Sequence, residues 1–204
     1  MSENDYKPSA AEVKALRDAT GAGMLEVRNA LVEAKGDLEA AKRILRERGS
    51  AKAAKRGGRS TGEGKIGAYI HGGGTKGVLV EVGCETDFVA NTDKFADFVK
   101  DMTLQIVSSE GTQWVSVDDV PEEARDAELA IYRKQAADEG KPENIQQKIA
   151  EGRLDKWYAD VVLLRQPYFR DESKTVEEVR AALSAETGEN IELKRFARYE
   201  VGQE

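Results

Sequence analysis

The sequence predicts an α+β protein, in which an N-terminal three-helix domain precedes an antiparallel sheet of at least three strands layered with helices. Three observations support this class. Glycine-punctuated amphipathic segments fill residues 1–49, two alternating apolar patterns flank a glycine turn at 65–85, and a third alternating segment follows at 190–201. A small, basic segment at 50–64 separates the two parts. We therefore expect a helical domain, a flexible linker and a larger domain at 65–204.

Composition limits the classes of function. The chain has 204 residues, a net charge of −7, one cysteine and one histidine. No apolar run approaches the roughly 20 residues of a membrane span, the acidic N-terminus does not resemble a secretory signal, and a single cysteine forms no internal disulfide. We expect a cytoplasmic protein without a membrane anchor, metal or cofactor. The acidic balance also argues against a dedicated nucleic-acid binder.

Caps and glycines in the N-terminal part of the sequence predict three short helices. Ser9 and Glu12 form a capping box at the first helix start, and Gly21 stands where a left-handed residue ends that helix. The second helix is expected at 24–35, and Asp37 caps a third helix that ends before Gly49. Helices this short are unstable alone in water, so the three must pack against one another.

The loop after the first helix has two interpretations. Glycine amides at a helix start can bind an anion, but this loop lacks the lysine and the spacing of a phosphate loop, and it follows a helix instead of a strand. We favour a helix–helix turn that exposes two apolar side chains as a docking patch for a partner protein. The predicted patch comprises Thr20, Gly21, Ala22, Gly23, Met24 and Leu25.

The segment from Ser50 to Gly64 is rich in small and basic residues and contains no large apolar residue. This composition is typical of a linker. Its bases Lys52, Lys55, Arg56 and Arg59 also suit the phosphates of RNA. We favour the solvated tether over the RNA site.

Two strands joined by a glycine-rich turn are expected at the start of the larger domain, at 65–71 and 77–85. The second strand alternates with period two and places four residues on one face, Val78, Val80, Val82 and Cys84. Cys84 is therefore expected to be buried and unreactive. His71, at the end of the first strand, is interpreted as a surface or interface residue, because spacing attaches no nucleophile or carboxylate to it.

The rest of the chain predicts mainly helices. Thr92 is a good N-cap for a helix whose buried stripe is Phe95, Phe98, Val99, Met102 and Ile106. The later elements are helices at 124–137, from Pro142 to Ile149 and at 154–164, an extended piece at 166–169, a capped helix from Thr175 to Gly188, and a half-buried antiparallel strand at 190–201.

The stretch Cys84-Glu-Thr-Asp-Phe-Val-Ala-Asn91 lies where the second strand passes into the helix capped by Thr92. Phe88 has two interpretations there. It can pack inward ahead of the helix as a hydrophobic staple, or it can point outward for a partner, because loops at element ends often carry function. Residue patterns alone leave these alternatives equal.

Several long motifs, in order along nearly the whole chain, resemble the elongation factor Ts family. They are Leu16-Arg-Asp-Ala-Thr-Gly-Ala-Gly-Met24, Val80-Glu-Val-Gly-Cys-Glu-Thr-Asp-Phe-Val-Ala90, Gln166-Pro-Tyr-Phe169 and Arg195-Phe-Ala-Arg-Tyr-Glu-Val201. The first two are long enough to be specific. The resemblance implies a non-catalytic exchange factor that promotes GDP release from the GTPase elongation factor Tu.

The resemblance also implies roles for individual segments. The N-terminal helices would form a ubiquitin-associated-like domain that docks on the GTPase near Thr20–Met24. The exchange element would be Thr86, Asp87, Phe88 and Val89, whose Asp-Phe pair enters beside the partner's Mg²⁺ site. This places Phe88 outward as a wedge.

In one respect the sequence departs from the family. Many members carry two related sheet subdomains, whereas only one strand-hairpin unit is present here. Short members are expected to compensate by forming a homodimer through the 65–204 domain. The competing function is an RNA- or ribosome-associated adaptor that uses the linker bases. The exchange-factor function does not require nucleic acid. An enzyme is the weakest alternative, because no nucleophile–base pair can be named.

Overall fold

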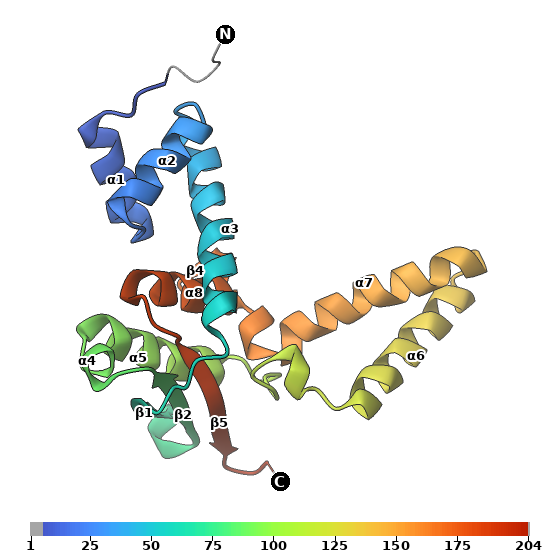
Figure 1. Cartoon of the computed structure of the whole chain (residues 1–204). Coiled ribbons are helices and arrows are strands. Elements are labelled where there is room, and N and C mark those ends of the chain that lie inside the picture. Colours follow the sequence, from blue (N-terminus) through green and yellow to red (C-terminus); the bar gives the residue numbers. More distant parts are fainter. Residues whose placement is uncertain (1–5, 204) are drawn as a thin grey trace. The chain divides into compact units, whose positions relative to one another are not determined.

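The computed structural model describes residues 6–203 and has an α+β fold, which confirms the predicted class (Figure 1). The chain divides into two compact units. The first unit contains Met1–Gly67, Val80–Lys100 and Glu178–Lys194. The second unit contains Ala68–Leu79, Asp101–Glu177 and Arg195–Glu204.

Three helices form the N-terminal part of the first unit, as predicted. They are α1 (Ala10–Thr20), α2 (Met24–Glu33) and α3 (Leu38–Arg56). The capping box of Ser9 and Glu12 is present, and Gly21 ends α1 with a φ of 68°. The Asp37 carboxylate caps α3 by accepting hydrogen bonds from two backbone amides. The shared core consists of Val13, Leu16, Val27, Ala30, Leu31, Ala41 and Leu45.

Helix α3 is longer than the sequence predicts. The expected end lay before Gly49, but the helix continues to Arg56 through half of the predicted linker. Alanines favour a helix in this stretch, and packing supports it, because Ala53 is fully buried. The Arg56 guanidinium also donates to the Ser184 carbonyl at 3.2 Å. The predicted tether is therefore helical in its first half, and the domain limits at 49 and 64 stay a prediction.

The three-stranded sheet consists of β1 (Glu63–His71), β2 (Lys76–Cys84) and β5 (Glu192–Glu200), in the order β1-β2-β5. A short 3-10 turn, Gly72–Gly74, joins the first two strands, and its three glycines have positive φ. The alternation predicted for β2 is confirmed, because Val78, Val80, Val82 and Cys84 are all buried.

Strand β5 differs from its prediction along its length. Leu193 is buried, whereas Tyr199, which the alternation places on the same face, is 74% exposed. Val201, just beyond the strand, is exposed as well. On the face expected to be inward, burial is therefore complete at Leu193, partial at Ala197 and absent at Tyr199.

Helix α5 (Asp93–Ser108) follows a single helical turn, α4 (Asp87–Ala90). Thr92 caps α5, since its hydroxyl accepts a hydrogen bond from the Phe95 amide. The predicted stripe is confirmed, because Phe95, Phe98, Val99, Met102 and Ile106 are all buried. Helix α8 (Val176–Thr187) ends at Gly188, as its capping pattern predicts.

The second unit contains a pair of long helices that run side by side, α6 (Glu122–Asp138) and α7 (Glu143–Val161) (Figure 1). The sequence predicted two helices in place of α7. Gly152 does not break the helix, because the roughly 1 kcal/mol that glycine costs in a helix is offset by burial of Ala150, Leu154 and Tyr158.

Short elements complete the second unit. They are the 3-10 turns Val117–Asp119 and Leu163–Arg165 and the two-stranded hairpin of β3 (Pro167–Tyr168) and β4 (Asp171–Thr175). The extended piece expected at 166–169 corresponds to β3, whereas β4 was missed. Within residues 6–203, no helix is both long and apolar enough to cross a membrane.

Candidate functional site

The predicted Thr86–Val89 segment forms a helical turn that presents Phe88 to solvent. Thr86 is the N-cap of α4, and its hydroxyl accepts a hydrogen bond from the Val89 amide at 3.3 Å. Val89 and Ala90 are buried, whereas the Phe88 side chain is 80% exposed. Of the two interpretations that the sequence left open, the inward staple is therefore excluded for Phe88. Val89 anchors the turn instead.

Asp87 stands beside Phe88 on the exposed side of the same turn. Its carboxylate makes no hydrogen bond or ion pair to any residue in the described range, 6–203. A carboxylate without a hydrogen-bond partner among the described residues and a large exposed apolar ring are thus adjacent. Such a pair suits recognition by another macromolecule, because large exposed aromatic side chains are frequent anchors of protein interfaces.

A carboxylate from a distant segment holds the start of this turn. Glu189, which follows α8, accepts hydrogen bonds from the backbone amides of Glu85 at 3.0 Å and Thr86 at 3.1 Å. Its other oxygen accepts a hydrogen bond from the Thr86 hydroxyl at 2.6 Å. The sequence does not reveal this contact, because the two segments are about a hundred residues apart and neither carries a distinctive pattern.

Glu85 makes the reciprocal contact. Its carboxylate accepts a hydrogen bond from the Asn190 amide at 2.6 Å and pairs with Arg59 at 3.2 Å. These contacts, the Asn190 hydrogen bond foremost, lower the pKa of Glu85. The Asn190 side chain also donates to the Arg59 carbonyl at 3.0 Å. Hydrogen bonds and an ion pair therefore join three chain segments at the C-terminal end of β2.

Cys84 lies directly before this cross-linked region and is fully buried, as predicted. Burial raises the pKa of its thiol, which disfavours the reactive thiolate. The thiol donates to the Thr86 carbonyl at 3.1 Å. Cys84 thus supports the turn and supplies no nucleophile.

The predicted docking loop, Thr20–Leu25, is a tight turn between α1 and α2. The Thr20 hydroxyl donates to the Leu16 carbonyl at 2.7 Å, and Gly23 stands at the N-cap of α2. Met24 and Leu25 are 62% and 66% exposed. The loop belongs to the same compact unit as α4. Two neighbouring apolar side chains in water are consistent with a docking patch, and that role stays a prediction.

His71 belongs to the second unit, where it is exposed at the end of β1. Its Nδ1 lies 3.1 Å from the Tyr69 hydroxyl, and the two rings are 5.8 Å apart. Nothing in this arrangement resembles a general base, and the interface role of His71 stays a prediction. Within residues 6–203, no group of three or more His, Cys, Asp or Glu side chains is arranged to hold a metal ion.

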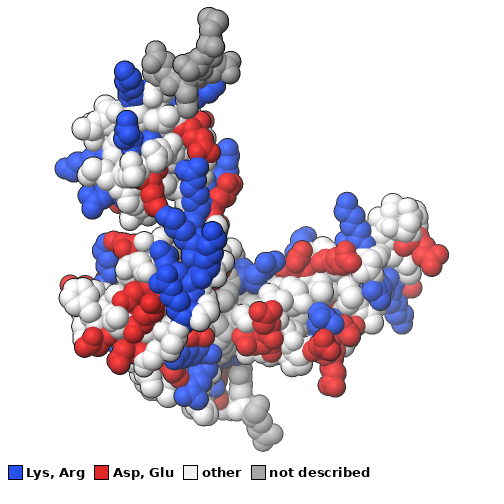
Figure 2. Space-filling view, viewed as in Figure 1, with Lys and Arg blue, Asp and Glu red and all other residues white. Residues whose placement is uncertain are grey.

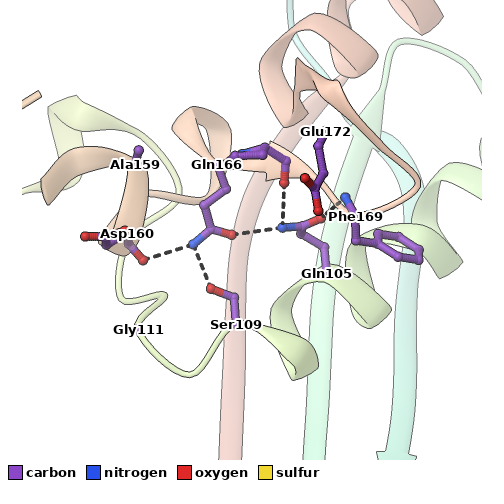
Figure 3. A pocket seen from close by; sticks show the side chains of 9 residues that line it. Gln105, Ser109, Gly111, Ala159, Asp160, Gln166, Phe169 and Glu172 are labelled. Atoms are coloured by element: carbon purple, nitrogen blue, oxygen red, sulfur yellow. Dashed lines mark hydrogen bonds between the residues drawn. The ribbon is translucent and has the colours of Figure 1, made fainter. Parts of the chain in front are cut away.

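A hollow of about 520 Å³ in the second unit is lined by two glutamines, Gln105 and Gln166, to which the sequence patterns assigned no functional role (Figure 3). The Gln166 amide donates to the Ser109 and Thr112 hydroxyls and to the Asp160 carbonyl. The Gln105 amide donates to the Gln166 carbonyl oxygen. Because these buried groups already satisfy one another, we interpret the network as structural.

Basic side chains gather along the C-terminal half of α3 (Figure 2). Of the four bases considered for RNA, three have protein partners. Lys52 pairs with Glu26, Arg59 pairs with Glu85, and Arg56 donates to Ser184. Lys52 and Arg59 are paired with carboxylates, and paired cations contribute less to phosphate binding, so this geometry disfavours the RNA alternative.

Residues 53–203 match the family described as Elongation factor TS. Elongation factor Ts of Caldanaerobacter subterraneus subsp. tengcongensis is 53% identical over 96% of this chain and 97% of its own length. Elongation factor Ts of Coprothermobacter proteolyticus is 52% identical, over 96% and 98% respectively, and that of Moorella thermoacetica is 50% identical, over 96% of each.

The reciprocal contact of Glu85 predicts an acid-dependent loss of stability. A carboxylate whose pKa is lower in the folded state stabilises the fold above its unfolded pKa, and the contribution disappears as pH falls through the folded value. We expect Glu85→Gln to lower the free energy of unfolding at pH 7, and the difference from the unmutated protein to shrink below about pH 4.5, the ordinary glutamate value. Urea unfolding at about pH 7 and pH 3.5 measures this. An equal difference at both pH values would contradict it.

Proposed function

The chain belongs to the elongation factor Ts family, a family of translation elongation factors, and on this premise we propose that it promotes GDP release from the GTPase elongation factor Tu. The proposal depends on one observation: Asp87 and Phe88 are both exposed on a turn that is held by hydrogen bonds. We assign no catalytic residue, cofactor or metal, and place the protein in the cytoplasm, where its partner works.

The proposed mechanism is a competition between two binding events. Mg²⁺ bound with a nucleotide requires nearly ideal octahedral coordination by oxygen ligands, so small displacements of these ligands would weaken Mg²⁺ binding strongly. We infer that Phe88 enters the GTPase beside this site as an apolar wedge and that Asp87 supplies charge next to it. The wedge needs only to bind the distorted, nucleotide-free GTPase better than the GDP-bound form. By linkage, GDP must then weaken the binding of this protein by the same factor.

The second contact in the proposal is the loop Thr20–Leu25, which docks on the GTPase. Its exposed Met24 and Leu25 are suited to an apolar pocket. Docking contacts that are equally strong in both nucleotide states change affinity without changing the exchange step, whereas wedge contacts change the exchange step itself. The two segments therefore have separable roles.

The third element of the proposal is a homodimer formed through the 65–204 domain. A groove in the second unit is lined by apolar side chains that lie open to solvent, among them Ile70, Leu79, Tyr199 and Val201. In β5 the face that is buried at Leu193 is exposed at Tyr199. A second copy of the chain that continues this burial would cover the groove. RNA is not required.

Replacing Asp87 and Phe88 together by alanine is expected to slow factor-stimulated GDP release by about 30-fold or more, because an interface anchor contributes roughly 2 kcal/mol or more. Stability should remain close to normal, since both side chains are exposed. Release of labelled GDP from elongation factor Tu measures the effect. The matched control is Ile131→Ala, which removes an exposed apolar side chain from α6. Normal release by the double variant would contradict the wedge.

Leu25→Asp tests the docking loop. Burying a leucine is worth about 1.5–3 kcal/mol, so its loss should raise the half-saturating concentration of the factor about tenfold or more. The maximal rate of GDP release at saturation should stay within about twofold, because docking does not act on the exchange step. Leu38→Asp, at another exposed leucine of the same three-helix part, should leave both values unchanged. A variant with normal half-saturation would remove the loop from the interface.

Leu79→Asp tests the homodimer. We expect the unmutated protein to sediment as a dimer at micromolar concentration and this variant to sediment as a monomer, because a buried, unpaired carboxylate opposes association. Ile145→Asp, at an exposed position of α7, should remain dimeric. If the unmutated protein is monomeric at every concentration tested, the homodimer is excluded.

A further inference from the structure

We propose that Glu189 is a positioning residue that fixes the direction in which Phe88 points. The expected effect of Glu189 on GDP release rests on the proposed function, whereas its effect on the order of the turn does not. A helical turn of four residues cannot be stable by itself, because nucleating a helix costs more than its few hydrogen bonds return. Contacts from outside α4 must therefore hold it.

Two kinds of contact hold the turn, and they do different things. Burial of Val89 and Ala90 ties one side of α4 to the core. Apolar burial is less directional than a hydrogen bond, so it decides which side of the turn faces the core but leaves some freedom of rotation. Glu189 supplies the directional part, because its two oxygens accept three hydrogen bonds from Glu85 and Thr86 in fixed positions.

The constraint passes from Glu189 into the turn through one hydroxyl. The Thr86 hydroxyl donates to Glu189 and accepts from the Val89 amide, so a single side chain connects the carboxylate to the first turn of α4. Phe88 lies between these two residues. Its side chain is 80% exposed and gains little orientation from packing, so its direction depends mainly on the backbone on either side.

Glu189 is itself held in place. The Ser184 hydroxyl donates to the Glu189 carbonyl at 2.5 Å, and Gly188 turns the chain after α8 with a φ of 77°. The next residue, Asn190, donates its amide to the Glu85 carboxylate. The two segments thus exchange backbone-to-carboxylate hydrogen bonds in both directions, which fixes their register.

The chemistry of the contact separates two substitutions. Glu189→Ala removes all three acceptor contacts. Glu189→Gln keeps them in kind, because the amide oxygen can accept from the two backbone amides and the amide nitrogen can donate to the Thr86 hydroxyl. A positioning role therefore predicts loss with alanine and rescue with glutamine.

The first experiment measures GDP release from elongation factor Tu over a range of factor concentrations. We expect Glu189→Ala to lower the maximal rate about tenfold, the effect of a few weakened hydrogen bonds, with half-saturation within about twofold. Glu189→Gln should stay within about threefold of the unmutated protein. Glu139→Ala, which removes an exposed carboxylate paired with Arg153, is the matched control. In a Phe88→Ala background, Glu189→Ala should have no further effect.

A second measurement uses the free protein and needs no partner. The backbone amide of Phe88 should have an NMR order parameter near 0.85 in the unmutated protein and in Glu189→Gln, and below about 0.6 in Glu189→Ala. An unchanged order parameter in Glu189→Ala overturns the inference whatever the exchange rates are. The inference is also overturned if Glu189→Gln releases GDP as slowly as Glu189→Ala. It is likewise overturned if Glu189→Ala slows GDP release further in the Phe88→Ala background. If the unmutated protein fails to release GDP, the proposed function fails, and the order parameters alone decide the role of Glu189.

Discussion

An exposed aromatic ring cannot be oriented by packing, because packing would bury it. This constraint governs the region around Phe88, where α4 is too short to be stable unaided. The structure solves it with hydrogen bonds that cross between distant segments, from Glu85 and Thr86 to Glu189 and from Asn190 back to Glu85. Burial of Val89 on the opposite side ties the same turn to the core.

The same division between buried support and exposed contact occurs at the loop between α1 and α2, in the same unit. Leu16 and Val27 belong to the core of the three helices, whereas Met24 and Leu25 between them face water. Gly21 makes this possible, because its left-handed conformation ends α1 abruptly and lets α2 start within three residues.

Sequence periodicity predicted the elements in which many residues repeat one pattern. The stripe from Phe95 to Ile106 and the alternating face of β2 were both correct, because burial of one face imposes the period. Helix caps were also predicted correctly, because the residues that form them are close together in the sequence. Helix α4 carries too few residues for a period, and Glu189 resembles any surface glutamate. Its role comes from a contact across about a hundred residues, which no local pattern encodes.

The proposed exchange mechanism explains why rigidity at α4 matters more than affinity there. Distorting the partner's Mg²⁺ site costs free energy, and that free energy must come from binding. A mobile Phe88 would lose part of its binding free energy to ordering the chain. A turn that is ordered in advance avoids this loss, so more of the binding free energy of Phe88 remains to distort the partner. The docking loop can then hold the two proteins together without favouring either nucleotide state. On the proposed mechanism, the polar contacts around Glu189 contribute to exchange as much as the exposed ring does, because they order the turn that carries the ring.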